Sequence, residues 1–312
     1  MPNQQYRYQL DASAKKYSCP NCQKRRFVLY LDVNNNKPIA DYVGRCDRED
    51  KCQYHYTPKQ FIEKHPKSIA PINWKVELPL PPPKQLGFIP EKYLYKSMYH
   101  YEINPLVTWL HTLFDTDLVK HLIKQFYIGT SKKYGGSTVF WQVDTDLKIR
   151  QAKIMHYDKT TGRRNKQTGA FFAGKSILKK EGIAEPNLQQ CLFGLHQLNQ
   201  DGNKIVAIVE SEKTAILMQA FSIQGIAPNY TWLATGGKTG CKWKEPTTWQ
   251  ALKNRTVILY PDLGAYEDWK GKAKFIGFHV HISDLLYLAA TKEQREDGLD
   301  VADFFLMTYA NI

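Results

Sequence analysis

Two short apolar strands that each end at an acidic residue constrain this chain more than any other feature. Residues 205–209 (IVAIV) stop at Glu210 and a helical pattern follows at once, while residues 257–260 (VILY) lead to Asp262. Such runs, alternating with helices, predict parallel strands buried on both faces. Because ligands gather at the carboxyl ends of parallel strands, we expect Glu210 and Asp262 to share a divalent metal ion there.

The residues around these acids refine the expectation. Ser211 is suited to cap the helix that follows Glu210. The later string GGKTG suggests a phosphate-binding loop, but Trp232 stands where that motif requires its first glycine, so we exclude a Walker-type loop. Near the C-terminus, GLDVADFF brings two further acids, Asp300 and Asp303.

Four of the six cysteines fall within 34 residues, as Cys19, Cys22, Cys46 and Cys52. In a protein without signs of secretion, this clustering favours a tetrahedral structural Zn²⁺ site over disulfides. The second pair has the wider C-x5-C spacing, and His55 could replace Cys46 or Cys52 as a ligand. Two β-like runs between the pairs predict a zinc ribbon.

The pattern divides the chain into four parts. We expect a zinc ribbon in residues 1–66 and a linker in residues 67–90, where six prolines fall between positions 71 and 90. A basic subdomain of helices and antiparallel strands should occupy residues 91–203, and a parallel-sheet domain residues 204–312. The predicted fold class is therefore α/β, or α+β over the whole chain.

The net charge of +13 lies outside the last of these parts, because residues 201–312 carry 12 basic and 13 acidic residues. Lys and Arg that neutralise phosphates provide most non-specific affinity for nucleic acids. Aromatic residues interleaved with the cations of the ribbon favour single-stranded nucleic acid. The candidate nucleic-acid-binding residues are Arg25, Arg26, Arg45, Arg150, Lys153, Arg163 and Arg164.

Lys153 has a particular place in this set. Residues 148–158 alternate as an antiparallel strand, with Gln151, Lys153, Met155 and Tyr157 on one face. We therefore expect Lys153 to line a template or nucleotide groove, and we expect Arg163 and Arg164 on a hairpin loop. No apolar stretch approaches the roughly 20 residues of a membrane span, and the N-terminus lacks a signal-peptide core, so we expect a cytoplasmic location.

The motifs VESEKTA, VILYPDLGA and GLDVADFF resemble those of the Toprim domain, shared by DnaG-type primases, phage primase-helicases, topoisomerases and some nucleases. A preceding basic segment and an N-terminal zinc ribbon are similar to the domain order of primases. As a whole, the chain resembles primase-like Toprim proteins carried on Bacteroidetes mobile elements.

The resemblance implies that Glu210, Asp262 and Lys153 are catalytic, and that Glu210, Asp262, Asp300 and Asp303 bind Mg²⁺ or Mn²⁺. It also implies a second aspartate at position 264, where this chain has glycine, and the alternative acid is Asp268, six residues beyond Asp262. Loss of one carboxylate makes a single ion or weak metal occupancy more favourable.

The expected function is that of a DNA primase-type nucleotidyltransferase in replication of a mobile element. Its partners would be single-stranded DNA, nucleoside triphosphates, and a replicative helicase or mobilisation proteins. Two alternatives stay open at this point. One is a Toprim nuclease that uses the same acids, and the other is a non-catalytic accessory protein that binds single-stranded DNA.

Overall fold

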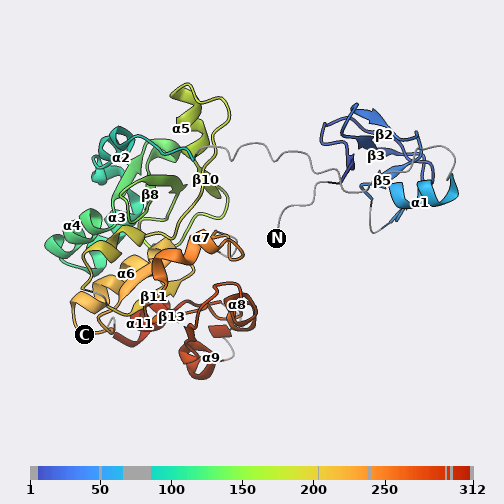
Figure 1. Cartoon of the computed structure of the whole chain (residues 1–312). Coiled ribbons are helices and arrows are strands. Elements are labelled where there is room, and N and C mark those ends of the chain that lie inside the picture. The colour runs from blue at the N-terminus through green and yellow to red at the C-terminus, as the bar shows by residue number, and fades with distance from the viewer. Residues whose placement is uncertain are drawn as a thin grey trace. The chain divides into compact units, whose positions relative to one another are not determined.

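The computed structural model describes residues 6–48, 51–65, 86–202, 204–237, 240–291, 294–295 and 298–309. The chain forms two compact units, Met1–Lys84 and Gln85–Ile312 (Figure 1). Most of the predicted linker, residues 67–85, lies outside the described residues. The predicted boundaries between parts of the chain stay a prediction.

The first unit is a small β-sheet built around one long strand. Strand β3 pairs with four others, and β6 extends the sheet beyond β5, in the order β1-β3-β5-β6 with β2 and β4 also on β3. All these pairings are antiparallel. Its interior is small: among the described residues, the buried cluster consists of Phe27, Leu29 and two cysteines. The strands are β1 Tyr8–Leu10, β2 Tyr17–Ser18, β3 Arg25–Asp32, β4 Lys37–Pro38, β5 Gly44–Cys46 and β6 His55–Tyr56.

A short helix, α1 (Pro58–Lys64), follows this sheet. Thr57 caps it, because its side chain accepts a hydrogen bond from the backbone N–H of Gln60 while the Gln60 side chain accepts one from the Thr57 N–H. This reciprocal pair is a capping box. The helix was not expected from the periodicity of the sequence.

The second unit contains an antiparallel sheet of order β10-β9-β8-β7. In β9 the predicted alternation holds, with Gln151, Lys153 and Met155 all buried on one face. Asp115 caps α4, since its side chain accepts a hydrogen bond from Leu118 N–H at 2.8 Å. The elements are α2 Glu91–Ser97, η1 Tyr101–Ile103, α3 Pro105–Leu113, α4 Thr116–Gln125, β7 Ile128–Ser131, η2 Lys133–Gly135, β8 Ser137–Val143, β9 Ile149–Met155, β10 Ala170–Phe172, α5 Gly174–Lys180 and η3 Leu195–Asn199.

A four-stranded sheet of order β12-β11-β13-β14 follows, and each of its neighbouring pairs is parallel. The carboxyl ends of β11 and β13 therefore open on the same edge, as the sequence predicts. The elements are β11 Val206–Val209, α6 Glu212–Ile223, β12 Thr231–Ala234, α7 Pro246–Trp249, η4 Gln250–Leu252, β13 Val257–Leu259, α8 Tyr266–Ala273, β14 His281–Ile282, α9 Leu285–Ala289 and α11 Val301–Tyr309.

Both sheets of the second unit contribute to one hydrophobic core. Helix α6 is central to it and contacts α4, α11, β11 and β12. Phe140 from β8 and Ala207 from β11 belong to the same buried cluster. The predicted fold class is confirmed, with an N-terminal zinc ribbon, an antiparallel sheet and a C-terminal parallel sheet. None of the described helices has the length and apolar character that a membrane crossing requires.

Gly162 lies in the loop between β9 and β10, where the loop packs against Trp109. It has a φ of +64°, and an added Cβ would lie 2.2 Å from the buried ring of Trp109. We expect Gly162→Ala to lower the free energy of unfolding by about 2 kcal/mol more than Gly169→Ala does. Gly169 is the matched control, since it has a φ of +61° and open space around its Cβ position. Equal losses for both variants in urea unfolding would contradict this packing.

Candidate functional site

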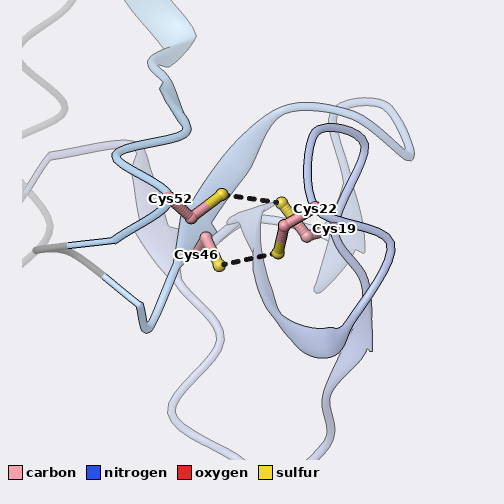
Figure 2. A group of neighbouring side chains, drawn as sticks. All are labelled: Cys19, Cys22, Cys46 and Cys52. Carbon is pink, nitrogen blue, oxygen red and sulfur yellow. Dashed lines mark hydrogen bonds between the residues drawn. The ribbon is translucent and has the colours of Figure 1, made fainter.

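Four cysteine side chains converge in the first unit (Figure 2). The sulfur of Cys19 lies 3.7 Å from that of Cys52, and the sulfur of Cys22 lies 3.9 Å from that of Cys46. All four sulfurs lie within 4.8 Å of one another. A tetrahedral zinc ion with Zn–S bonds of about 2.3 Å places its sulfurs about 3.8 Å apart. The cluster therefore fits a structural zinc ion.

The backbone around the cysteines forms two tight turns. The N–H of Gln23 donates to the carbonyl of Cys19 at 2.9 Å, and Gln23 adopts a φ of +59°. In the wider second turn the Cys52 N–H donates to the Arg48 carbonyl at 2.7 Å. His55 is not part of the cluster, because its Nε2 is hydrogen-bonded to the Tyr30 hydroxyl at 2.9 Å. The geometry thus favours the four-cysteine set over the His55 alternative.

Cations gather on the surface of the ribbon. Arg25 and Arg26 are exposed, whereas Arg45 is half-buried. A hollow of 410 Å³ is lined by four basic residues and one acid, Lys24, Arg25, Arg26, Asp47 and Arg48. Asp47 is paired with Lys16 at 2.8 Å, so the hollow keeps an excess of positive charge. Such a surface is suited to the phosphates of a nucleic acid.

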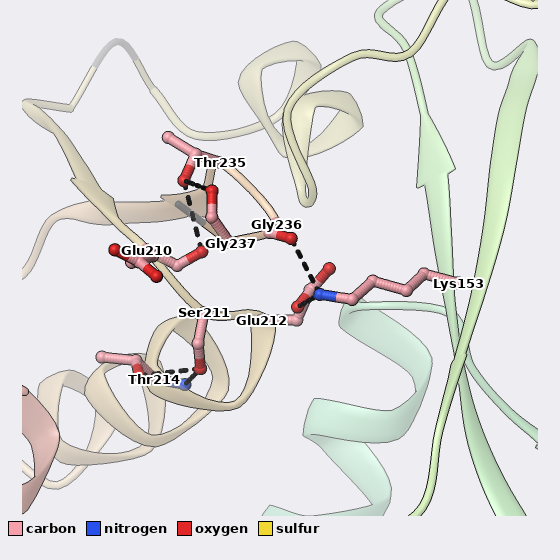
Figure 3. Close-up of polar contacts among 8 residues, drawn as sticks. All are labelled: Lys153, Glu210, Ser211, Glu212, Thr214, Thr235, Gly236 and Gly237. Atoms are coloured by element: carbon pink, nitrogen blue, oxygen red, sulfur yellow. Dashed lines mark hydrogen bonds and ion pairs between the residues drawn. The ribbon is translucent and has the colours of Figure 1, made fainter. Parts of the chain in front are cut away.

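Glu210 lies where β11 ends in the second unit (Figure 3). Its backbone carbonyl accepts hydrogen bonds from the N–H groups of Gly236 at 3.0 Å and Gly237 at 2.8 Å. Ser211 caps α6 as predicted, with its side chain accepting from Thr214 N–H at 3.2 Å. The glycine turn after β12 thus holds the backbone from which the Glu210 carboxylate projects. Both glycines have positive φ, which explains their place in this turn.

Asp262 follows β13 and completes the pair of acids at this edge. Burial raises its pKa to about 9, and the negative charges of Asp300, Glu210 and Asp303 add to the effect. Asp262 is therefore close enough to the other three acids for their negative charges to disfavour its ionisation. The exposed Asp268 does not contribute to this shift and is instead paired with Lys272 at 2.6 Å.

Asp300 and Asp303 also have a structural role at the start of α11. The N–H of Asp303 donates to Asp300 Oδ1 at 2.9 Å, and the N–H of Asp300 donates to Asp303 Oδ2 at 3.3 Å. The Thr214 hydroxyl donates to the other oxygen of Asp300. Both Asp300 oxygens and one Asp303 oxygen thus accept hydrogen bonds from within the protein.

The acids provide the oxygen ligands that Mg²⁺ prefers, but their carboxylates are not already gathered into a compact group. Within the described ranges, the four cysteines are the only group of three or more His, Cys, Asp or Glu side chains compact enough to hold a metal. Mg²⁺ keeps several waters and is usually bound through one or two carboxylates together with substrate phosphates. The raised pKa of Asp262 indicates negative charge that a cation would compensate.

Lys153 does not lie in an open groove. Its ammonium donates to Glu212 Oε2 at 2.7 Å and to the Gly236 carbonyl at 2.8 Å. Lys153 is 5% exposed and Glu212 is 1% exposed. Figure 3 shows the Glu212 side chain directed to Lys153 and the Glu210 carboxylate on the other side of the turn. Arg150, on the opposite face of β9, is paired with Asp144.

Two cations, Lys213 and Arg163, lie close to the acids. Lys213 follows Glu212 on α6, with its ammonium 5.3 Å from the Trp109 ring centroid and 3.4 Å from the Gly162 carbonyl. Burial and Asp300 raise the pKa of Asp303, whereas Lys213 and Arg163 act in the opposite direction. The loop that carries Arg163 therefore brings positive charge to the acid cluster. Arg164, its neighbour, is exposed.

Sequence reasoning did not single out Glu212 and Lys213 as functional residues. Lys213 carried a usable signal, because a cation in the first turn of a helix opposes the helix dipole and needs another reason to be there. The pairing of Glu212 with Lys153 carried no local signal, because the two residues are 59 positions apart in the chain.

Two models of known protein families match this chain. A family model described as a domain of unknown function, DUF6371, matches residues 104–263, which is half of the sequence. This chain belongs to the DUF6371 family. A zinc beta-ribbon finger model matches residues 6–67, in agreement with the cysteine cluster. No curated protein matches the sequence.

Solved primase structures are similar to this DUF6371 protein at low identity. The primase fragment of the bacteriophage T7 primase-helicase is 16% identical, with 61% of this chain and 70% of that chain covered and a TM-score of 0.36. The E. coli primase catalytic core is 13% identical, with 70% of this chain and 81% of that chain covered and a TM-score of 0.41. The zinc-binding and RNA polymerase domains of Aquifex aeolicus primase are 11% identical, with 96% of this chain and 77% of that chain covered and a TM-score of 0.38. At TM-scores below 0.5 these similarities do not by themselves assign a function.

The cysteine cluster predicts about one zinc ion per chain. We expect Cys19→Ser to lose that zinc and to unfold the ribbon, because the ribbon has too little core to fold without metal. Elemental analysis and the circular dichroism of the two proteins would measure both effects. Cys191→Ala is the control, since Cys191 is buried in the second unit and should keep the zinc content unchanged. A wild-type protein without zinc would contradict the assignment.

The pKa of Asp262 predicts a pH-dependent stability. The folded protein binds this proton more tightly than the unfolded chain, whose aspartates titrate near pH 4. The resulting stability is complete below about pH 4 and is lost as the pH rises to about 9, with a slope of up to about 1.4 kcal/mol per pH unit.

Urea unfolding between pH 5 and pH 9, without added divalent ions, would measure this slope. We expect Asp262→Asn to be less sensitive to pH than wild type, because the amide does not ionise. Added Mg²⁺ should recover stability in wild type more than in the variant. Parallel pH profiles for the two proteins would show that Asp262 is not the titrating group.

Proposed function

We propose that this protein is a DNA primase-like enzyme with a Toprim-type acidic site. The observation that carries the proposal is the meeting of Glu210, Asp262 and Asp303 at one sheet edge, with Lys213 and Arg163 beside them. Carboxylates that attract Mg²⁺ next to cations that attract phosphates make up a site for a metal-bound nucleoside triphosphate. The zinc ribbon and its basic hollow would bind the single-stranded DNA template.

In this proposal the protein's own groups position the reactants. Arg163 and Lys213 would hold the triphosphate, and the acids would hold Mg²⁺ or Mn²⁺ against it. A bound Mg²⁺ supplies charge neutralisation and a lowered pKa for the attacking 3′-hydroxyl. The new bond joins that oxygen to the α-phosphorus of the incoming nucleotide, and pyrophosphate leaves with the electrons of the broken bond.

One observation favours a second candidate, a non-catalytic accessory that binds single-stranded DNA. Gly264 stands where the Toprim resemblance implies an aspartate, and it cannot provide a carboxylate. Asp300 is occupied by Thr214 and by the backbone of α11. A site with fewer free carboxylates would hold metal weakly. The setting we infer for either candidate is the replication or mobilisation of a mobile element in the cytoplasm, with a helicase or mobilisation proteins as partners.

Primer synthesis provides the test. The protein is incubated with single-stranded DNA, labelled nucleotides and Mg²⁺ or Mn²⁺, beside Glu210→Gln and Asp262→Asn. We expect wild type to make labelled oligonucleotides and each variant to be roughly 100-fold slower or worse, since each loses a charge that binds the metal. Asp268→Asn, at an exposed acid paired with Lys272, is the matched control and should keep wild-type activity.

The other outcomes separate the alternatives. Shortened template without added nucleotides would identify a nuclease that uses the same acids. Binding of DNA with neither product nor cleavage would identify the accessory. Primer synthesis that persists in both Glu210→Gln and Asp262→Asn would mean that this acidic edge is not the active site.

A further inference from the structure

Lys153 connects the two segments that flank Glu210. Its ammonium bonds to Glu212, two residues beyond Glu210 on one side, and to the carbonyl of Gly236 on the other. Gly236 and its neighbour Gly237 donate their N–H groups to the carbonyl of Glu210. The ammonium thus joins the start of α6 to the turn after β12, and the backbone of Glu210 lies between them (Figure 3).

The environment of this ion pair is almost closed to solvent. Lys153 is 5% exposed, and two of its three N–H groups are directed to Glu212 and Gly236. A buried lysine and a buried glutamate each lose several kcal/mol of hydration, which their attraction repays only with good geometry. An apolar pair of similar volume would often be as stable, so stability alone does not explain why charges stand here.

We propose that Lys153 and Glu212 are positioning residues that fix the Glu210 carboxylate for metal binding. The inference rests on the proposed function, because it assigns Glu210 to a metal. It differs from a direct catalytic role for Lys153, which the Toprim resemblance implies. Groups that orient a metal ligand typically contribute a factor of 10 to 100 in metal affinity.

The close fit at Gly236 supports the same role. Gly236 has a φ of +83°, and an added Cβ would lie 3.2 Å from Glu212 Oε1. The turn therefore lies directly against the ion pair and has little freedom to shift. If the lysine were removed, the Gly236 carbonyl would lose its donor, and the N–H groups that hold Glu210 would be free to move.

The decisive experiment replaces both charges together. Lys153→Met alone would leave the Glu212 carboxylate buried without a partner and could unfold the protein. The double variant Lys153→Met, Glu212→Leu keeps the volume and removes both charges, so we expect it to fold with thermal stability near wild type. We expect its affinity for Mn²⁺, titrated by electron paramagnetic resonance on zinc-loaded protein, to fall about 10- to 100-fold.

Two control variants give the Mn²⁺ affinities expected without an effect and with the full loss of a ligand. Lys175→Met, at an exposed lysine on α5, should leave Mn²⁺ affinity unchanged. Glu210→Gln should lose Mn²⁺ affinity at least as strongly as the double variant, because it removes the carboxylate itself. A double variant that folds and binds Mn²⁺ like wild type would overturn the positioning role.

The outcomes also separate this inference from the proposed function. Wild type that binds Mn²⁺ tightly, with a weakened double variant, but that makes no oligonucleotide would overturn primer synthesis and keep the positioning role. Wild type that makes primers, with a double variant of unchanged Mn²⁺ affinity, would overturn only the positioning role. Wild type that binds no Mn²⁺ would overturn both.

Discussion

Compensation of buried negative charge is the constraint on which the second unit depends. The edge of the parallel sheet gathers Glu210, Asp262, Asp300 and Asp303, and burial there favours the protonated form of Asp262. The part of the chain that forms the parallel sheet has no excess of positive charge to compensate these acids, since residues 201–312 carry slightly more acids than bases. Lys213 on α6 and Arg163 in the loop after β9 act to lower the pKa of Asp303, which burial raises, while Lys153 on β9 pairs with the buried Glu212. The two sheets therefore complete one electrostatic arrangement as well as one hydrophobic core.

The sequence predicted features whose cause is local. Apolar runs that end at acids predicted the places of Glu210 and Asp262, because the carboxyl ends of parallel strands lie at the same edge of a sheet. Ser211 was predicted as a cap from its place before a helical pattern. The pairing of Lys153 with Glu212 could not be predicted, since alternation fixes which face of β9 a side chain occupies but not what packs against that face. The capping box of α1 was visible as T-x-x-Q and was missed because its helix is short.

Backbone conformation gives a physical account of Gly264. Its φ of +85° lies in the left-handed region, and nothing surrounds its Cβ position. An aspartate would fit the space but would pay about 1 kcal/mol of backbone strain there. The turn after Asp262 thus has a backbone conformation that glycine favours. The backbone at position 264 therefore favours glycine over aspartate by about 1 kcal/mol, although the space around it would accept a carboxylate.

A site with fewer carboxylates gains more from a fixed one. When several acids surround a metal, a displaced ligand can be replaced by a neighbour, but here Gly264 offers none and Asp300 is held by Thr214 and α11. Glu210 then has to be in place before the metal arrives, because ordering it on binding would cost affinity. The glycine turn and the buried Lys153–Glu212 pair provide that order in advance. The costly burial of two charges is understandable as the means by which a sparse acidic edge keeps its strongest candidate ligand fixed.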